Sequence, residues 1–278
     1  MKKKGSLLWA VLTAVTALLL VVCIVAIPVT SAFATAINVA LGAKTQEVIP
    51  DPDAKIYFWS DYENEEDLVA FEKQLCRDIE AEGAALLVNR DNTLPLAQGT
   101  KFTPFSQSSF NLLYGGTGSG QVSADDAISL KAAMDGVFGE NSVNPEQWKF
   151  YAGAGYKRVN ADTTGGSQTQ YRINEIPWEK YDATASTWPA YGDVALVVLA
   201  RSGGEGADLP SGLPELEEYM TDGDYLRLCK EEVEMFENLE KLKADGTFKK
   251  IVVLLNSSNA LQLDFVDDYG IDAVLWIG

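Results

Sequence analysis

The sequence contains no histidine and only three cysteines among its 278 residues. Without histidine, this chain supplies no Ser–His or Cys–His nucleophile and few of the usual zinc ligands. Cys23, Cys76 and Cys229 are too few for a disulfide scaffold, and we interpret Cys76 and Cys229 as small buried side chains of helices. Any chemistry performed by this chain must therefore rest on carboxylates, hydroxyls, tyrosines or lysines.

Basic residues are also scarce. The chain has 22 Lys and Arg against 40 Asp and Glu, for a net charge of −18. Such a surface repels phosphate backbones, and no basic stripe offsets it, so nucleic acid is not an expected partner. Hydrophobic residues make up 47% of the chain, which is typical of a globular protein.

The amino terminus carries an uncharged apolar run from Leu7 to Ile27, preceded by Lys2, Lys3 and Lys4. Roughly 20 helical residues span a bilayer, and flanking lysines stay in the cytoplasm. We therefore predict a single-pass signal-anchor over residues 1–29, a juxtamembrane linker over 30–55 and an extracellular main domain. The small-x-small pattern of residues 32–34 favours a cleaved signal peptide instead, whose apolar core is usually shorter. Either reading predicts export.

Hydrophobic periodicity predicts an α/β fold for the rest of the chain, with a mostly parallel sheet sandwiched by helices. The helix over 224–243 has an inward face of Leu226, Cys229, Val233, Phe236, Leu239 and Leu242. The aromatic-rich stretch 139–189 fits either exposed rings or packing between layers. Predicted strands are 84–88, 101–106, 194–200, 251–255 and 273–277, and predicted helices are 65–81, 124–134 and 224–243. Because the chain stops at the end of a buried strand, we expect the natural protein to continue.

Two glycine-containing loops are candidates for chemistry. The segment 201–210 directly follows the strand 194–200, and ligands of open parallel sheets bind beyond the carboxyl ends of strands. Glu205 lies between glycines in this loop, although most such acids are ordinary solvated residues. The loop 115–120 lacks the Gly-Lys-Ser/Thr ending of a phosphate loop, so a flexible turn is its simplest interpretation. Asp208, Asp222 and Asp224 lie near a sugar or simply precede and cap a helix.

Several segments together resemble the α/β sandwich domain of glycoside hydrolase family 3, which includes many β-glucosidases and β-xylosidases. Residues 82–96 resemble its "EGxVLLKN…LPL" opening, and 114–120 its "GxGSG" loop. Residues 202–208 are similar to its "SGEGxDR" segment, and 250–256 to its "KVIVLLN" strand. Residues 271–278 resemble the strand that leads into a further glycine-rich turn. The resemblance covers residues from about 57 to the end, in order, and implies a truncated sandwich domain over 56–278.

This resemblance implies that Glu205 is the catalytic acid/base of a retaining glycosidase that hydrolyses β-linked glucosides, xylosides or short oligosaccharides. The expected substrate contacts come from Ser202, Gly204, Asp208, Gly118 and Ser119, with no metal or cofactor. The family's nucleophile is an aspartate on a separate (β/α)8 barrel, which we expect after Gly278, so the fragment alone should be inactive. The sequence departs from the family at Leu209, where an arginine usually follows the aspartate.

The physical chemistry of the reaction is consistent with this role. A retaining glycosidase needs two carboxyl groups about 5–5.5 Å apart, one as nucleophile and one as acid and then base. The acid must hold its proton near neutral pH, which burial and a neighbouring negative charge both favour. The alternative is a non-catalytic, membrane-anchored domain that binds sugar or acts as a scaffold, and the missing arginine supports it.

Overall fold

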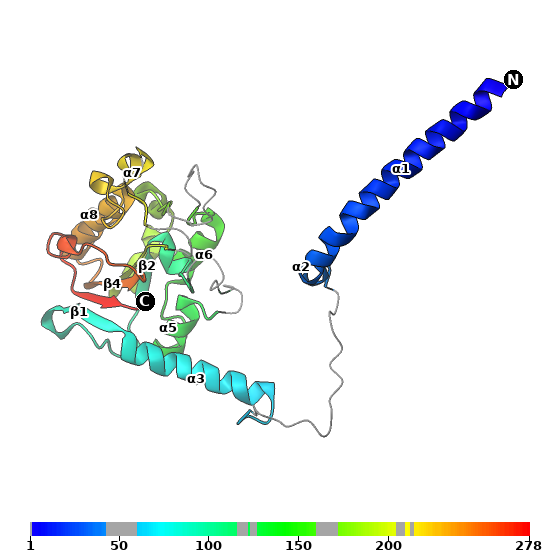
Figure 1. The fold of residues 1–278 in the computed structure, drawn as a ribbon. Helices are drawn as coiled ribbons and strands as arrows, with labels where there is room; N and C mark the ends of the chain where they lie inside the picture. Colours follow the sequence, from blue (N-terminus) through cyan, green and yellow to red (C-terminus); the bar gives the residue numbers. More distant parts are fainter. Residues whose placement is uncertain are drawn as a thin grey trace. The chain divides into compact units, whose positions relative to one another are not determined.

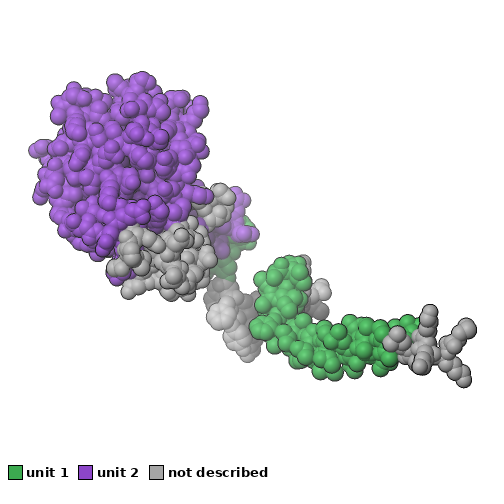
Figure 2. Space-filling model, turned by 90° about the horizontal axis from the view of Figure 1, so that it is seen from above, with its two compact units in different colours: residues 1–64 green, residues 65–278 purple. Residues whose placement is uncertain are grey.

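The computed structural model describes residues 2–42, 60–115, 122, 127–159, 172–203, 209–211 and 214–278. It divides into two compact units, Met1–Asn64 and Glu65–Gly278, which are coloured separately in Figure 2.

The first unit contains helices α1 (Lys2–Ala32) and α2 (Ala34–Ala40). The 25 residues Leu8–Ala32 are long and apolar enough to cross a membrane, a criterion that signal sequences also meet. Within this segment the Thr13 hydroxyl donates to the Trp9 carbonyl and the Thr16 hydroxyl to the Leu12 carbonyl, each at 2.9 Å. These hydroxyls are therefore satisfied inside the helix, which suits an apolar environment.

The second unit is built on a five-stranded sheet of order β1-β5-β4-β3-β2 (Figure 1). Strands β2 to β5 are parallel, and β1 pairs antiparallel with β5. The mostly parallel α/β fold predicted from the sequence is confirmed. The strands are β1 (Ala85–Asn89), β2 (Phe102–Phe105), β3 (Val194–Ala200), β4 (Lys250–Asn256) and β5 (Ala273–Trp276).

Helices and short 3₁₀ segments connect these strands. The α-helices are α3 (Glu65–Gly83), α4 (Gln107–Phe110), α5 (Leu130–Phe138), α6 (Pro145–Ala154), α7 (Pro214–Tyr219) and α8 (Lys230–Ala244). The 3₁₀ segments are η1 (Arg90–Asn92), η3 (Trp178–Ala183), η4 (Ala185–Tyr191), η5 (Thr221–Gly223) and η6 (Asp264–Val266).

Strand β3, which lies between β4 and β2 in the sheet, is buried along its whole length because both sheet faces are covered. Its odd-numbered residues 195–199 join a core with Met235, Phe236 and Leu239 of α8. Its even-numbered residues 194 and 196 join a second core, against which Met134 and Phe138 of α5 pack. The two helices thus cover opposite faces, which is the expected sandwich architecture.

Aromatic rings of the stretch 139–189 pack between these layers. The Phe105 ring at the end of β2 lies 5.9 Å from Trp178 and 5.5 Å from both Trp188 and Phe248, measured between ring centroids. Tyr181 and Trp188 are almost fully buried. Of the two interpretations of this stretch, packing between layers is therefore confirmed for its described residues.

Two helices begin later than predicted. Helix α8 starts at Lys230 rather than 224, so Leu226 and Cys229 precede it. The reason is a capping box, in which the Glu232 carboxylate accepts the Cys229 backbone N–H at 2.8 Å. Helix α5 starts at Leu130, where the Ser129 hydroxyl caps the Ala132 N–H. Residues 124–126 of that prediction lie outside the described residues.

The prediction that Cys76 and Cys229 are buried side chains within helices was wrong in one respect for each residue. Cys229 is buried, but it caps α8 instead of lying inside a helix. Cys76 is exposed on α3. The apolar side chains Phe71, Leu75 and Ile79 of that helix are likewise 48%, 43% and 61% exposed. Helix α3 is therefore confirmed as a helix, but its apolar face lies open to solvent among the described residues.

Candidate functional site

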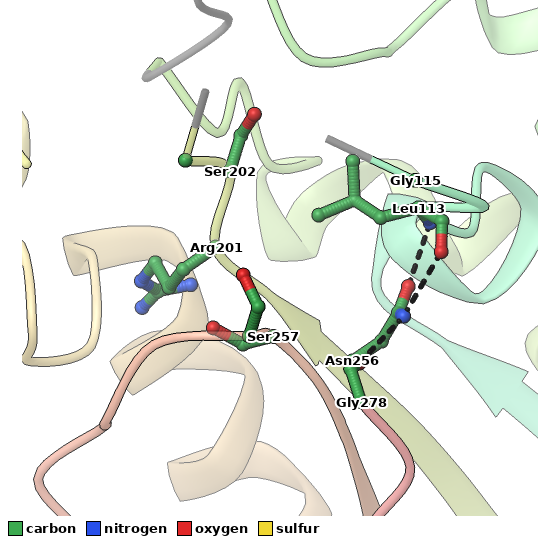
Figure 3. A pocket seen from close by; sticks show the side chains of 9 residues that line it. Leu113, Gly115, Arg201, Ser202, Asn256, Ser257 and Gly278 are labelled. Atoms are coloured by element: carbon green, nitrogen blue, oxygen red, sulfur yellow. Dashed lines mark hydrogen bonds between the residues drawn. The ribbon is translucent and has the colours of Figure 1, made fainter. Parts of the chain in front are cut away.

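The carboxyl ends of the parallel strands meet at a small cavity of about 110 Å³ (Figure 3). Its wall comes from the residues after β3 and β4, from Gly278 after β5, and from the segment after α4. This volume is below the roughly 300–1,000 Å³ that small-molecule sites usually enclose. The lining residues are Leu113, Gly115, Arg201, Ser202, Gly203, Asn256, Ser257, Ser258 and Gly278.

Asn256, the last residue of β4, fastens two of these segments together. Its Oδ1 accepts the Leu113 N–H at 2.6 Å, and its Nδ2 donates to the Leu113 and Gly278 carbonyls at 3.1 and 3.0 Å. Figure 3 shows this side chain between the two backbones. The amide uses both its donor and acceptor sides, so it fixes the segment entering the loop 115–120 against the sheet.

Arg201 follows β3 directly and is fully buried with Glu232 of α8. The two guanidinium nitrogens lie 3.0 and 2.7 Å from the two Glu232 oxygens, a bidentate pair. Burial alone would lower the pKa of Arg201, but the Glu232 charge and hydrogen bonds overcome it and raise the pKa. The guanidinium also donates to the Tyr225 and Arg227 carbonyls at 3.1 and 2.6 Å. This arginine therefore ties the end of β3 to the segment before α8.

A second buried carboxylate, Glu175, lies at the end of β2. It accepts the Ser106 hydroxyl at 2.5 Å and the Gln107 and Ile176 N–H groups at 2.9 and 2.8 Å. Burial raises the pKa of Glu175 to about 7, although these hydrogen bonds favour its charged form. Ser106 has a φ of +72°, and its hydroxyl caps α4 by accepting from Ser108. Glu175 thus stabilises the left-handed backbone of Ser106, directly after the carboxyl end of β2.

The elevated pKa of Glu175 predicts a pH-dependent stability. A carboxyl with a folded pKa near 7 and an unfolded value near 4.5 is protonated more strongly in the folded state. Its contribution is complete below pH 4.5 and is lost as the pH rises to about 7, a change of about 3 kcal/mol. We expect the melting temperature to fall over this window, which no histidine titration obscures.

The matched variants for this prediction are Glu175→Gln and Glu179→Gln. Glu175→Gln should flatten the melting temperature between pH 4.5 and 7, at some constant loss, because an amide accepts fewer hydrogen bonds. Glu179 is 75% exposed at its side chain and serves as the control that keeps the original slope. An unchanged slope in Glu175→Gln would contradict the assignment.

The structure describes only part of the site predicted from the sequence. Ser202 is buried at the cavity, with its backbone N–H donating to the Tyr225 hydroxyl at 3.0 Å. Asp222 and Asp224 lie before α8 rather than at its start, and Asp224 accepts the Leu226 N–H and the Gln262 amide. Gly118, Ser119, Gly204, Glu205 and Asp208 lie outside the described residues.

Sequence reasoning missed Asn256 and Tyr225. Asn256 ends the apolar run 251–255, and a polar side chain at the carboxyl end of a buried strand was the available signal. Tyr225 gave no such signal, because its partner Ser202 is remote in sequence and the segment was assigned to a helix. Leu209, where the family has an arginine, packs against an apolar cluster that includes Leu216, Met220 and Tyr225.

These features define an α/β sandwich whose cavity lies at the carboxyl ends of β3, β4 and β5. Residues 84–278 match the model of the Glycosyl hydrolase family 3 C-terminal domain. The chain therefore belongs to glycosyl hydrolase family 3, with a β-glucosidase-like domain.

Two curated relatives are named as beta-glucosidases. The chain is 30% identical over 156 residues to beta-glucosidase A of Butyrivibrio fibrisolvens, covering 52% of this chain and 17% of that protein. It is 24% identical over 201 residues to a beta-glucosidase of Ruminococcus albus, covering 72% of this chain and 19% of that protein. The chain thus spans less than a fifth of the length of these relatives.

Solved structures show the same fold. A beta-glucosidase from Paenibacillus barengoltzii matches with a TM-score of 0.54 at 23% identity, over 73% of this chain and 21% of that one. Beta-glucosidase 3B from Thermotoga neapolitana, in complex with alpha-D-glucose, matches with a TM-score of 0.54 at 22% identity, over 75% of this chain and 27% of that one.

Proposed function

We propose that this chain is the sandwich part of an exported retaining β-glycosidase, with Glu205 as its catalytic acid/base. The observation that carries the proposal is the family match over 84–278, which includes the segment after β3 that holds Glu205. The names of the relatives support β-linked glucosides as the substrate class. The nucleophile is then an aspartate on a (β/α)8 barrel of the natural protein.

The domain organisation and location follow from the same proposal. Residues 56–278 form the sandwich domain, residues 30–55 link it to the membrane, and residues 1–29 anchor it. The length and apolar character of Leu8–Ala32 support an anchor. The lysines before it support a location of the sandwich domain outside the cell.

In this mechanism the Glu205 carboxylic acid protonates the glycosidic oxygen while the barrel aspartate attacks the anomeric carbon. The Glu205 carboxylate then removes a proton from water, which attacks the same carbon from the face that the leaving group left. Two inversions give net retention. Within the described residues, the Tyr225 hydroxyl accepts the Ser202 N–H after β3, and the Asn256 amide donates to the Leu113 carbonyl at the end of β4.

The test is the stereochemistry of hydrolysis by the natural, full-length gene product. With an aryl β-D-glucoside or cellobiose as substrate, proton NMR should detect β-glucose as the first product, followed by slow mutarotation. The α-anomer appearing first would exclude the two-carboxylate retaining mechanism. Glucoside binding by calorimetry without any hydrolysis would instead establish the second candidate, a membrane-anchored sugar-binding or scaffolding domain. Leu209 in place of the usual arginine favours that candidate.

A further inference from the structure

The described lining of the cavity at the carboxyl ends of β3, β4 and β5 presents hydroxyl groups and no free charge. Arg201 is the one charged residue of that lining, and every nitrogen of its guanidinium already donates, to Glu232 or to a backbone carbonyl. Asn256 likewise uses its amide on Leu113 and Gly278. No aromatic ring belongs to the described lining, so it offers no face on which a sugar ring stacks. What it offers a ligand is neutral hydroxyls.

Ser202 contributes a buried hydroxyl to this lining. The residue is 2% exposed, and the Tyr225 hydroxyl already bonds both its backbone N–H and its carbonyl, at 3.0 and 3.2 Å. The Ser202 side-chain hydroxyl itself makes no hydrogen bond with the described residues, whereas the Ser257 hydroxyl donates to the Asn259 carbonyl at 3.1 Å. Figure 3 shows Ser202 and Ser257 across the cavity from Leu113. Because a buried hydroxyl is unfavourable when unpaired, a polar group that enters the cavity gains this hydrogen bond.

The size of the cavity limits what can enter it. Its volume of about 110 Å³ has room for roughly three or four water-sized groups, at roughly 30 Å³ each. A whole pyranose is larger than this, but a hydroxymethyl substituent, with one carbon and one oxygen, fits. Its methylene matches Leu113, the apolar side chain of the lining, and its hydroxyl matches Ser202. A carboxylate of similar size would meet no unpaired cation here, because Glu232 already pairs with Arg201.

We propose that this cavity receives the hydroxymethyl group of a hexopyranose, with the Ser202 hydroxyl as its hydrogen-bond partner, and that it selects hexoses over pentoses. This inference rests on the proposed glycosidase function and deepens it by naming the part of the sugar that is recognised. The reacting sugar and a leaving-group sugar carry the same hydroxymethyl chemistry, and the experiment distinguishes these two sources.

The experiment uses the natural, full-length gene product and two pairs of substrates. The p-nitrophenyl β-D-glucoside and β-D-xyloside differ only in the hydroxymethyl group of the reacting sugar. Cellobiose and 4-O-β-D-glucosyl-D-xylose differ only in that of the leaving sugar. In Ser202→Ala, kcat/KM should fall about three- to tenfold on the hydroxymethyl-bearing member of one pair, as expected for one neutral hydrogen bond. It should fall less than about twofold on the other member of that pair.

Ser202→Val tests the volume of the cavity. The larger side chain occupies space that the hydroxymethyl group needs, so kcat/KM for the hexose member of the same pair should fall by about tenfold or more. The xylose member, which has only a hydrogen at that position, should lose less than about threefold. Ser142→Ala is the matched control, because its fully buried hydroxyl donates to Asp135 at 2.9 Å and the residue does not line the cavity. It should leave the ratio within each pair unchanged.

The outcomes separate the cavity from the glycosidase itself. A selective loss within the aryl glycoside pair assigns the cavity to the reacting sugar, and one within the disaccharide pair assigns it to the leaving sugar; either supports the proposal. Equal losses within both pairs, in Ser202→Ala and in Ser202→Val, would overturn it and leave the proposed function standing. An unmutated protein that hydrolyses no glycoside would refute both.

A second measurement decides if the Ser202 variants fail to fold. In saturation-transfer NMR of the unmutated protein with D-glucose, the hydroxymethyl protons should receive the strongest saturation, because they lie deepest in the protein. Stronger saturation of any ring proton would overturn the proposal.

Discussion

Glu205→Gln is expected to lower kcat on a glucoside with a poor leaving group by about 10²–10⁴-fold, the usual contribution of a general acid. An amide of the same shape cannot donate a proton to the glycosidic oxygen. An activated leaving group departs without protonation. The glycosylation step of substrates that carry one should therefore be nearly unaffected. Steady-state kinetics of the natural gene product on aryl glucosides of graded leaving-group pKa would measure this difference.

Two further variants sharpen this prediction. In Glu205→Ala, external azide should restore turnover of an activated substrate, because a small anion can attack the glycosyl-enzyme without base assistance. Asp222→Asn provides a control carboxylate, with its side chain 74% exposed and 3.8 Å from Arg227. It should stay within about twofold of the unmutated protein, as expected for a surface ion pair. Equal losses on every leaving group in Glu205→Gln would argue against an acid role.

The fold was largely predictable because buried parallel strands leave a strong signal in the sequence. The runs 194–200 and 251–255 are continuous, β-branched and apolar, and the structure has strands at both positions. The antiparallel strand β1 was found as a strand, but its pairing with β5 was not. Pairing direction depends on which distant segments meet, and a short apolar run such as 84–88 does not encode that.

Helix boundaries and burial were harder to predict because tertiary contacts decide them. Leu226 and Cys229 continue the helical periodicity of α8, yet Glu232 caps the helix at Cys229 and pairs with Arg201. The periodicity of residues 65–81 correctly indicated a helix, but not that Phe71, Leu75 and Ile79 would be exposed. An amphipathic pattern identifies which face of a helix is apolar. It does not identify what covers that face.

For the candidate site, the sequence indicated the edge of the sheet but not the contacts that organise it. The position of residues 202–208 after a buried strand placed the site at the carboxyl edge, where Ser202 lines the cavity. The Arg201–Glu232 pair and the Ser202–Tyr225 hydrogen bonds join residues 31 and 23 positions apart. Nothing in the local pattern connects such residues, since an arginine and a glutamate at this spacing are common in any sequence.

Glu232→Ala is expected to destabilise the second unit by about 3–5 kcal/mol, the usual effect of removing one partner from a buried ion pair. Both side chains are essentially inaccessible, with 0% and 1% exposure. The alanine variant leaves the Arg201 charge buried without a counter-ion and removes the acceptor of the Cys229 N–H. At about 2–4 °C per kcal/mol for domains of this size, the melting temperature should fall by about 10 °C.

Lys249→Ala distinguishes the effect of burial from the simple loss of an ion pair. Lys249 binds Asp193 at 2.6 Å, slightly closer than Arg201 approaches Glu232, but its side chain is 73% exposed. Water solvates the remaining Asp193 charge in that variant, so the loss should stay below about 1 kcal/mol and the melting temperature should shift by only a few degrees. Equal shifts in the two variants would mean that solvent reaches Arg201. The end of β3 would then lack the rigid anchor from which the Glu205 segment departs.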